Sequence, residues 1–262
     1  MNKKYLIGGG LVAVVLIAVV GWFLFLKDDA PDAVDVGDAN EQLDADLAAA
    51  EGTVGDTSPE GSTPDDSAPD DSAAPASEGI DGTWVIDDEI GEFDFDTASG
   101  SFAGFRVAEE LTVGETTAVG RSGNVSGSVT IADGVLTGAG VTVDMDAIVS
   151  NDSRRESAIK RTVNTSEFPD ATFAFDGGVD VSSIEVGGAA QTFEIEGALT
   201  VAGVTNPVSF TIDANVRDDG FGIIVGSTEI VWEEFGVTPP SAPIVVSIAD
   251  QGTVEFQLVV AR

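Results

Sequence analysis

Carboxylates are the side chains of this sequence whose spacing could support catalysis or metal binding. Glu194 and Glu196 stand at positions i and i+2, a spacing that some β-sandwich glycosidases use for nucleophile and acid. They alternate with apolar residues and no aromatic sugar platform follows, so we interpret them as solvent-facing side chains of a strand. The Asp-x-Asp pairs at 94–96 and 144–146 lack the loop spacing of a calcium site. We therefore predict no catalytic residue, no metal site and no enzymatic activity.

The residue types that are missing exclude further chemistry. The chain of 262 residues contains no cysteine and no histidine. It therefore cannot form a disulfide scaffold, a zinc ribbon, a thiol nucleophile or a Ser-His-Asp triad. Its 46 acidic and 11 basic side chains give a net charge of −35, whose sign opposes binding to nucleic acid. A binding or structural role remains, or an enzyme built on carboxylates alone.

Basic side chains gather in one polar segment, residues 151–161, which holds Arg154, Arg155, Lys160 and Arg161. These are half of the basic residues found after residue 80. An Asn or Asp at the start and an acidic residue in the first turn predict a short helix. Arg154 and Arg155 could bind the phosphate or quinone headgroup of a ligand. The alternative is a solvated helix whose exposed ion pairs each contribute under about 1 kcal/mol.

The rest of the C-terminal region alternates between apolar and polar side chains, which is typical of antiparallel strands with one solvated face. The longer alternating stretches are 141–145, 193–201, 208–216 and 254–258, and shorter ones are 84–86, 93–95, 105–107, 173–175 and 230–232. Turn signals fall at 132–134, 176–178 and 218–220. Such strands close into a barrel or stack as a sandwich, and the periodicity does not distinguish these two all-β architectures.

Large apolar side chains of the buried faces are the candidate ligand-binding residues. They are Trp84, Phe105, Val107, Phe173, Phe175, Phe193, Phe210, Ile212, Trp232 and Phe256. In a hollow barrel they would line a channel suited to a long apolar ligand. In a filled barrel the same residues would pack a dry core.

The N-terminal segment 6–26 carries no charged side chain and, as a helix, would span about 32 Å, close to the roughly 30 Å of a bilayer core. Lys3 and Lys4 precede it, so the positive-inside rule places the N-terminus in the cytoplasm. A cleaved signal peptide is the alternative, but the apolar run is long and no small-residue cleavage site ends it. We predict a single-pass anchor over residues 1–27, with the rest of the chain outside the cytoplasm.

Residues 28–80 contain sixteen acidic side chains and no basic one, with many Ala, Ser, Pro and Gly. Low hydrophobicity and high net charge predict a disordered linker. Residues 40–51 could form a short helix, but the sequence shows nothing apolar against which it would pack. We therefore expect an anchor (1–27), a linker (28–80) and one folded domain (81–262).

Local motifs of the folded domain resemble the YceI-like family, whose members bind polyisoprenoid-type lipids. The most specific segment is 197–208 (GALTVAGVTNPV), which is similar to the family's G-x-L-T-x-x-G-V-T-x-P-V pattern. Further similar segments are 82–87 (GTWVID), 102–107 (FAGFRV), 153–156 (SRRE), 168–173 (FPDATF) and 234–236 (EFG). The chain departs from the family at Glu233 and Ala202, where relatives often carry a basic residue and a histidine.

The resemblance implies a lipocalin-like, antiparallel, eight-stranded β-barrel with one short helix. It also implies a lumen that takes an isoprenoid lipid or quinone, with no other cofactor. The resulting hypothesis is a membrane-tethered, extracytoplasmic protein that sequesters or carries an apolar lipid. The alternative is a cell-surface interaction domain with a filled β core and no ligand.

Overall fold

The computed structural model describes residues 30–53, 79–87 and 89–262. The predicted membrane anchor at 6–26 and the linker residues 54–78 lie outside the described residues. Within the described ranges, no helix combines the length and the apolar character that crossing a bilayer requires.

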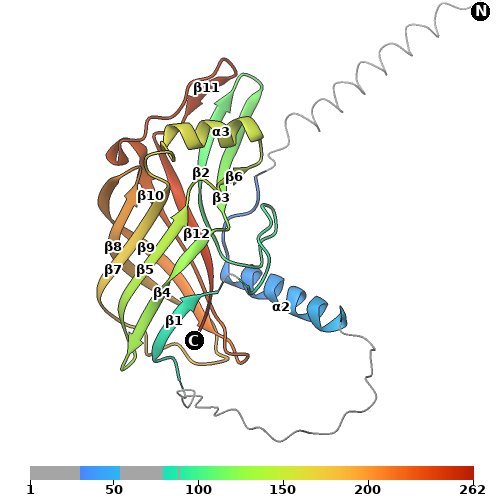
Figure 1. Ribbon diagram of the computed structural model, residues 1–262, viewed down its shortest axis with the longest axis vertical. Coiled ribbons are helices and arrows are strands. Elements are labelled where there is room, and N and C mark those ends of the chain that lie inside the picture. The colour runs from blue at the N-terminus through green and yellow to red at the C-terminus, as the bar shows by residue number, and fades with distance from the viewer. Residues whose placement is uncertain (1–29, 54–78, 88) are drawn as a thin grey trace, which may run out of the picture.

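Eight antiparallel strands close into a barrel, which confirms the expected architecture (Figure 1). In ring order they are β1 (Gly82–Ile86), β4 (Val125–Ala132), β5 (Val135–Asp144), β7 (Asp170–Asp180), β8 (Gln191–Val201), β9 (Val204–Val216), β10 (Gly222–Val231) and β12 (Gln251–Ala261). The ring closes where Val85 and Ile86 of β1 pair with Ala261 and Val260 of β12. A closed ring leaves no free edge between these strands and buries one face of each.

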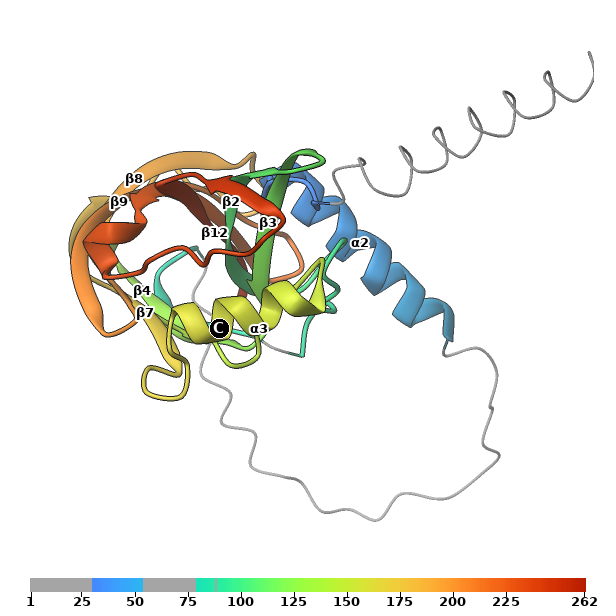
Figure 2. The same cartoon turned by 90° about the horizontal axis from the view of Figure 1, so that it is seen from above.

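The two ends of the barrel differ because β12 has a different partner in each half. Its last residues pair with β1, whereas residues 253–257 pair with β2 (Phe102–Leu111). From β2 the wall continues through β3 (Gly114–Ser122) to the short β6 (Val149–Ser150), and β11 (Val245–Ile248) pairs with the end of β2. Helix α3 (Ser153–Thr162) borders this second end, as the view from above shows (Figure 2).

The expected helix over 151–161 is confirmed, and its start follows ordinary capping chemistry. Asp152 is the N-cap, and its carboxylate accepts a hydrogen bond from the Arg154 N–H at 2.7 Å. Glu156 lies in the first turn and reaches back to the N–H of Ser150 at 3.3 Å. Ile159 is buried, so this largely polar helix has an apolar side that faces the barrel.

Two of the expected turns are correct, and one lies inside a strand. Asp133 and Gly134 connect β4 to β5 with positive φ angles of 54° and 71°, and the turn at 218–220 connects β9 to β10. The glycines at 177 and 178 instead belong to β7, where a register shift against β5 accommodates them. A glycine pair in a strand interior often marks such an irregularity rather than a turn.

The expected strand at 93–95 is wrong, because these residues form a closed loop. The backbone N–H groups of Ser99 and Gly100 both donate to the carbonyl of Glu92, which brings the two ends of the loop together. The Asp94 carboxylate accepts from the Asp96 N–H and so stabilises a local turn. Trp232 also leaves the strand pattern, because it begins the 3-10 helix η1 (Trp232–Phe235).

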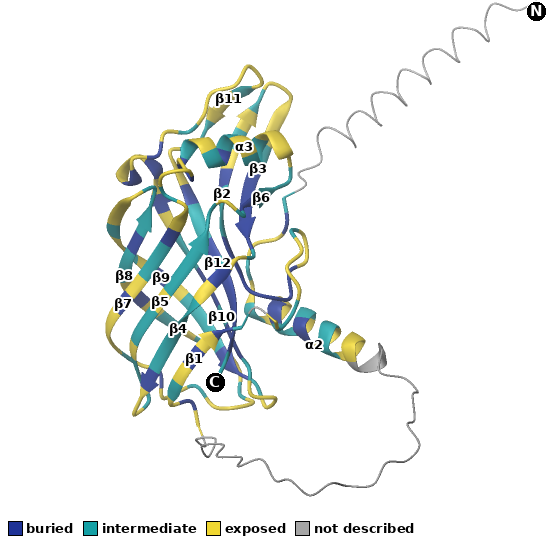
Figure 3. Ribbon diagram, in the orientation of Figure 1, coloured by how far each residue is buried: buried dark blue, intermediate teal, exposed yellow. Residues whose placement is uncertain are grey.

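Two expectations are wrong here. Residues 30–53 are not a disordered linker, and the helix among them is additional to the single helix that was expected. Helix α2 (Val36–Thr53) packs on the outside of the barrel (Figure 1). Its Ala39 and Leu43 are 1% and 0% exposed and lie in a cluster with Ile223, Val225 and Val259. Outward-facing positions of β10 and β12 are therefore apolar, and α2 packs on them. The sequence of the linker alone could not predict this packing surface. Figure 3 shows α2 changing from buried near the barrel to exposed further along.

The barrel is filled at the β1 end. Trp84, Ile131, Leu258 and Val260 belong to one buried cluster there, with Phe193 packed against it. The indole N–H of Trp84 donates to the carbonyl of Ile80 at 2.8 Å, so its single polar group is satisfied. This end has the dry, packed core that the sequence left as an alternative.

Candidate ligand-binding cavity

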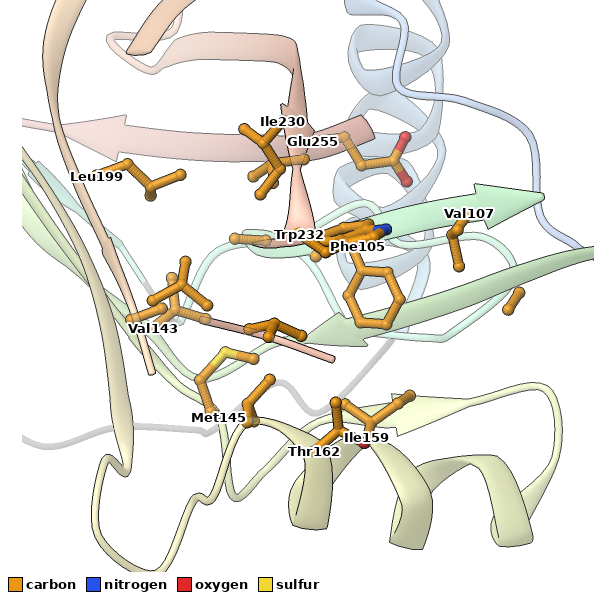
Figure 4. Close-up of a pocket in the computed structure, with 18 of the residues that line it drawn as sticks. Phe105, Val107, Val143, Met145, Ile159, Thr162, Leu199, Ile230, Trp232 and Glu255 are labelled. Carbon is orange, nitrogen blue, oxygen red and sulfur yellow. The ribbon is translucent and has the colours of Figure 1, made fainter. Parts of the chain in front are cut away.

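The opposite end of the barrel is hollow. A partly open space with a volume of about 190 Å³ lies between the strands and α3 (Figure 4). Its wall is formed mainly by aliphatic and aromatic side chains, including Val107, Val143, Met145, Leu199 and Ile230. Strands β2, β3, β5, β7, β8, β9, β10 and β12 all contribute lining residues, so the cavity is formed by many strands and not by one element.

An aromatic floor separates the cavity from the packed end. The ring centroids of Phe173 and Phe210 are 5.3 Å apart with an interplanar angle of 83°, and those of Phe210 and Phe256 are 5.3 Å apart at 60°. Such edge-to-face contacts stabilise aromatic pairs beyond their buried area. Because the three residues come from β7, β9 and β12, the floor extends across the interior.

Glycines on neighbouring strands give two of these rings room to lie against the wall. A methyl group at Gly226 would lie 2.5 Å from Cζ of Phe256, and one at Gly197 would lie 2.4 Å from Cζ of Phe173. Both distances are too short for a real contact, so a larger residue would push each ring inward. These close approaches help to keep the space above the floor open.

Helix α3 and the segment after η1 form the roof. Ala158, Ile159 and Val163 face the cavity from the helix and the residue that follows it. Pro239, between η1 and β11, and Ile248, the last residue of β11, also line the cavity. The roof is therefore made of one short helix and one connecting segment, whereas the walls are continuous strands.

An ion pair provides polar groups at the edge of the cavity. Arg155 Nη2 on α3 lies 2.9 Å from Glu109 Oε2 on β2, and both residues line the cavity. Arg155 also donates to the side-chain carbonyl of Asn151. The guanidinium is only partly exposed, so it could exchange the Glu109 contact for an anionic or carbonyl-bearing headgroup.

A second, more deeply buried charge cluster lies at the cavity wall and is centred on Glu255, which is one of the lining residues. The Glu255 carboxylate points away from the cavity, toward the side of the barrel that carries α2 (Figure 4). Arg121 Nη2 donates to Glu255 Oε1 at 2.9 Å, and Arg106 Nε makes an ion-pair contact with Oε2 at 3.2 Å without hydrogen-bond geometry. Burial lowers the pKa of Arg121, while the hydrogen bond and the charge of Glu255 oppose that shift. This cluster is structural, because its charges face one another and not the cavity.

Six of the ten candidate side chains line the cavity: Phe105, Val107, Phe173, Phe210, Trp232 and Phe256. Trp84 and Phe193 lie in the packed core at the other end, and Phe175 and Ile212 do not line the cavity. Of the two headgroup candidates, Arg155 lines the cavity, whereas Arg154 is exposed and outside it. Ligand binding by these residues stays a prediction.

Several cavity residues were absent from the candidates chosen from the sequence. Val143 and Met145 belong to an alternating stretch that was recognised as a strand, and Ile159 with Val163 has the i, i+4 spacing of a helix face. Aliphatic residues carry no signal that separates a cavity wall from a packed core. The alternation therefore identified the inward face but not the hollow part of it.

Glu194 and Glu196 are both exposed, and neither lines the cavity. The Glu194 carboxylate accepts hydrogen bonds from the hydroxyl groups of Ser209 and Thr211 on the neighbouring strand. Their interpretation as solvent-facing strand residues is therefore confirmed.

The family model of the YceI-like domain matches residues 84–260, which is most of the chain and nearly all of the barrel. The chain belongs to the YceI-like family. This confirms the family that the motifs suggested, and the YceI-like region includes every strand of the closed ring. None of the curated proteins matches the chain.

Solved structures with a similar fold include three bacterial proteins. A polyisoprenoid binding domain from Saccharophagus degradans has a TM-score of 0.49 and 16% identity, over 62% of this chain and 93% of that chain. BcnA from Burkholderia cenocepacia has a TM-score of 0.46 and 18% identity, over 60% and 95%. A YCEI protein from Campylobacter jejuni has a TM-score of 0.43 and 15% identity, over 55% and 84%. The YceI-like assignment itself rests on the family match.

Proposed function

We propose that this YceI-like protein binds an apolar lipid chain, of the isoprenoid or isoprenoid-quinone type, in the cavity beneath α3. The observation that carries this proposal is a cavity of about 190 Å³ whose wall is almost entirely apolar. Apolar cavities of roughly this size stay dry and accept apolar molecules, because water finds no hydrogen-bond partners in them.

The mechanism is sequestration. A lipid chain that enters the cavity removes apolar surface from water, which contributes about 0.8 kcal/mol for each methylene group. The aromatic floor of Phe173, Phe210 and Phe256 would limit how deeply the chain penetrates. Arg155, at the cavity edge, would interact with a polar headgroup left near the roof.

The proposal includes a location. Residues 6–26 would anchor the chain in the cytoplasmic membrane as a single span, with Lys3 and Lys4 on the cytoplasmic side. The barrel would then lie outside the cytoplasm, where it could sequester or carry a lipid taken from that membrane. Cysteine accessibility at residues before and after the span, tested in intact cells, would establish this orientation.

A surface interaction domain with a filled core is the second candidate. The observation that favours it is the β1 end, where Trp84 and its neighbours form a packed core. The hollow end favours lipid binding instead, because an interaction domain has no need of an apolar cavity.

Mass spectrometry of bound lipid tests the first proposal. Residues 28–262 would be purified without detergent, and the intact protein and its solvent extract analysed. We expect an apolar lipid to accompany the protein and to be depleted in Ala118→Trp, since Ala118 is buried and lines the cavity. Val186→Trp, at an exposed position away from the cavity, is the matched control. A lipid-free protein that also ignores added geranylgeraniol would exclude lipid binding.

A further inference from the structure

The end of the barrel that holds the cavity has an unusual surface. Residues 235–249 contain no charged side chain, although the chain as a whole has a net charge of −35. Acidic residues flank this segment directly, Glu234 before it and Asp250 after it. The segment includes part of the cavity roof and strand β11, so this uncharged segment lies beside the cavity.

Large apolar side chains are exposed on this uncharged segment and on the turn beside it. Val246 is 58% exposed and Ile244 is 51% exposed, and Val113 in the adjacent β2–β3 turn is also 51% exposed. The Thr112 N–H donates to the carbonyl of Ile244 at 2.9 Å, which holds the turn and the segment together. We name Val113, Ile244 and Val246 the apolar tip.

Exposed basic side chains lie on α3, at the same end of the barrel. Arg154 and Arg161 are both exposed and stand seven residues apart, about two helical turns, on one side of the helix. They would attract anionic lipid headgroups, whereas the acidic surface of the rest of the barrel would be repelled by them. Exposed apolar and basic groups therefore occur together at the cavity end of the barrel.

The docked N-terminal segment leads toward this same end. The Arg106 guanidinium donates to the carbonyl of Pro31, and Arg121 Nη2 donates to that of Asp32 at 2.7 Å. Further along the chain, α2 packs on Ile223, close to the β1 end of the barrel. Followed backward from α2, the chain therefore runs toward the cavity end, and Figure 1 shows this course.

The length of chain before Pro31 fits contact between the tip and the bilayer. Five residue steps separate Leu26, the end of the predicted span, from Pro31, and they reach about 17 Å when extended. From Arg106 on β2 to Val113 in the turn that follows, seven residue steps span at most about 23 Å, or about 18 Å along the axis of a barrel with strands tilted by 40°. The connection from Leu26 to Pro31 is therefore no longer than the distance from Arg106 to the apolar tip. Even when it is fully extended, the apolar tip stays close to the bilayer.

We propose that the cavity end of the barrel rests on the bilayer in which residues 6–26 are anchored. The apolar tip inserts at the membrane surface, and Arg154 and Arg161 face lipid phosphates. The ligand then passes between bilayer and cavity without crossing water. This inference rests on the proposed lipid binding and adds the route by which the lipid enters.

Site-specific fluorescence tests the orientation. The chain has no cysteine, so Val246→Cys and Val186→Cys each give one labelling site, and both positions are exposed. The labelled full chain would be reconstituted in vesicles of phosphatidylcholine with a minority of phosphatidylglycerol. We expect quenching by a nitroxide lipid at position 246 and quenching by aqueous iodide at position 186. Equal quenching at the two positions, or a position 246 already shielded before vesicles are added, would overturn the proposal.

A transfer assay separates this inference from lipid binding itself. A dansyl-labelled geranylgeraniol would be offered to the full chain from vesicles and, separately, from detergent micelles. We expect the double change Ile244→Asp and Val246→Asp to slow uptake from vesicles about tenfold, because charge opposes insertion of the tip, and to leave uptake from micelles unchanged. Val186→Asp is the matched control. Equal uptake from vesicles by the tip variant and the wild type contradicts the inference alone, whereas no uptake from either source contradicts lipid binding.

Discussion

Glu255 and its two arginines show how a buried charge supports the wall of this barrel. The Glu255 carboxylate is 1% exposed and contacts both Arg106 and Arg121. The Arg121 guanidinium also lies 4.4 Å from the ring centroid of Phe102 and donates to the carbonyl of Phe95. Three segments distant in sequence thus meet around one carboxylate, on the outer side of the cavity wall.

Removing that carboxylate charge should destabilise the fold. We expect Glu255→Gln to lower the free energy of unfolding by about 3 kcal/mol, because two largely buried cations lose their counterion. Urea denaturation measures this change. Glu229→Gln, at an exposed position on the neighbouring β10, is the control and should change stability by under about 0.5 kcal/mol. Equal effects of the two substitutions would contradict a structural role for the cluster.

Two glycines with different surroundings provide a matched test of the aromatic floor. A methyl group at Gly226 would meet Phe256, whereas one at Gly140 would meet nothing within 4 Å. We expect Gly226→Ala to cost about 1–3 kcal/mol of stability through overpacking, and Gly140→Ala to be neutral or slightly stabilising. Thermal unfolding of both variants measures this difference, and a similar cost for both would mean that Phe256 moves freely.

Among the elements, α2 contributes most to the difference between the expected and the observed fold. Its Asn40 side chain hydrogen-bonds that of Asn215 at 3.1 Å, and its Asp44 accepts from Arg217 at 2.6 Å. Polar contacts therefore surround the apolar contact made by Leu43. Because this face of the barrel would otherwise expose apolar strand residues, α2 acts as part of the folded domain.

Truncating the central apolar residue of α2 should weaken the whole domain. We expect Leu43→Ala to lower the free energy of unfolding by about 2–3 kcal/mol, since Leu43 is fully buried. Ala48→Gly in the exposed part of the same helix should cost no more than about 1 kcal/mol, through helix propensity alone. Guanidinium denaturation compares the two. A smaller cost for Leu43→Ala than for Ala48→Gly would show that α2 is not docked in solution.

The β9–β10 turn holds α2 through a pH-dependent contact. Burial alone would raise the pKa of Asp219, but hydrogen bonds from Arg217 and from the Phe221 N–H keep that pKa below its usual value. A lowered pKa in the folded state stabilises the protein above about pH 4, and this stabilisation is lost as the pH falls further. We expect wild type to exceed Asp219→Asn in stability by under about 1 kcal/mol at pH 6, because the contact is partly exposed, and the gap to close by pH 2. A gap that widens on acidification would contradict this linkage.

At the scale of the whole molecule, the barrel combines a rigid end and a hollow end. The packed β1 end accounts for much of the buried core, while the cavity leaves apolar surface without contacts at the other end. An apolar ligand would supply those missing contacts and thereby stabilise the folded chain.

Ligand should therefore raise the stability of the whole domain. At a free concentration of about 100 times Kd, geranylgeraniol should increase the free energy of unfolding by about 2.7 kcal/mol, provided that it binds only the folded state. The shift would be measured by chemical denaturation of refolded, lipid-free protein. Ala118→Trp should show no shift, since it fills the cavity, and a shift in this variant as large as in wild type would place the ligand elsewhere.

The sequence by itself determined the strands, the family and the excluded chemistry. Side chains alternate with period two along a strand, so Phe173, Phe210 and Phe256 were correctly expected to face inward. The 197–208 segment carried the family resemblance, and the absence of histidine and cysteine removed whole classes of catalytic and metal site.

Only the tertiary structure decided which inward residues border a space and which outward residues are covered. Alternation specifies the face of a strand but not the height along the barrel, so Trp84 fills the core while Phe105 lines the cavity. The docking of α2 depends on apolar residues of β10 and β12 that lie more than a hundred positions away, such as Val259. Composition measured along residues 28–80 alone could not register that surface, because burial is a property of segments brought together by folding.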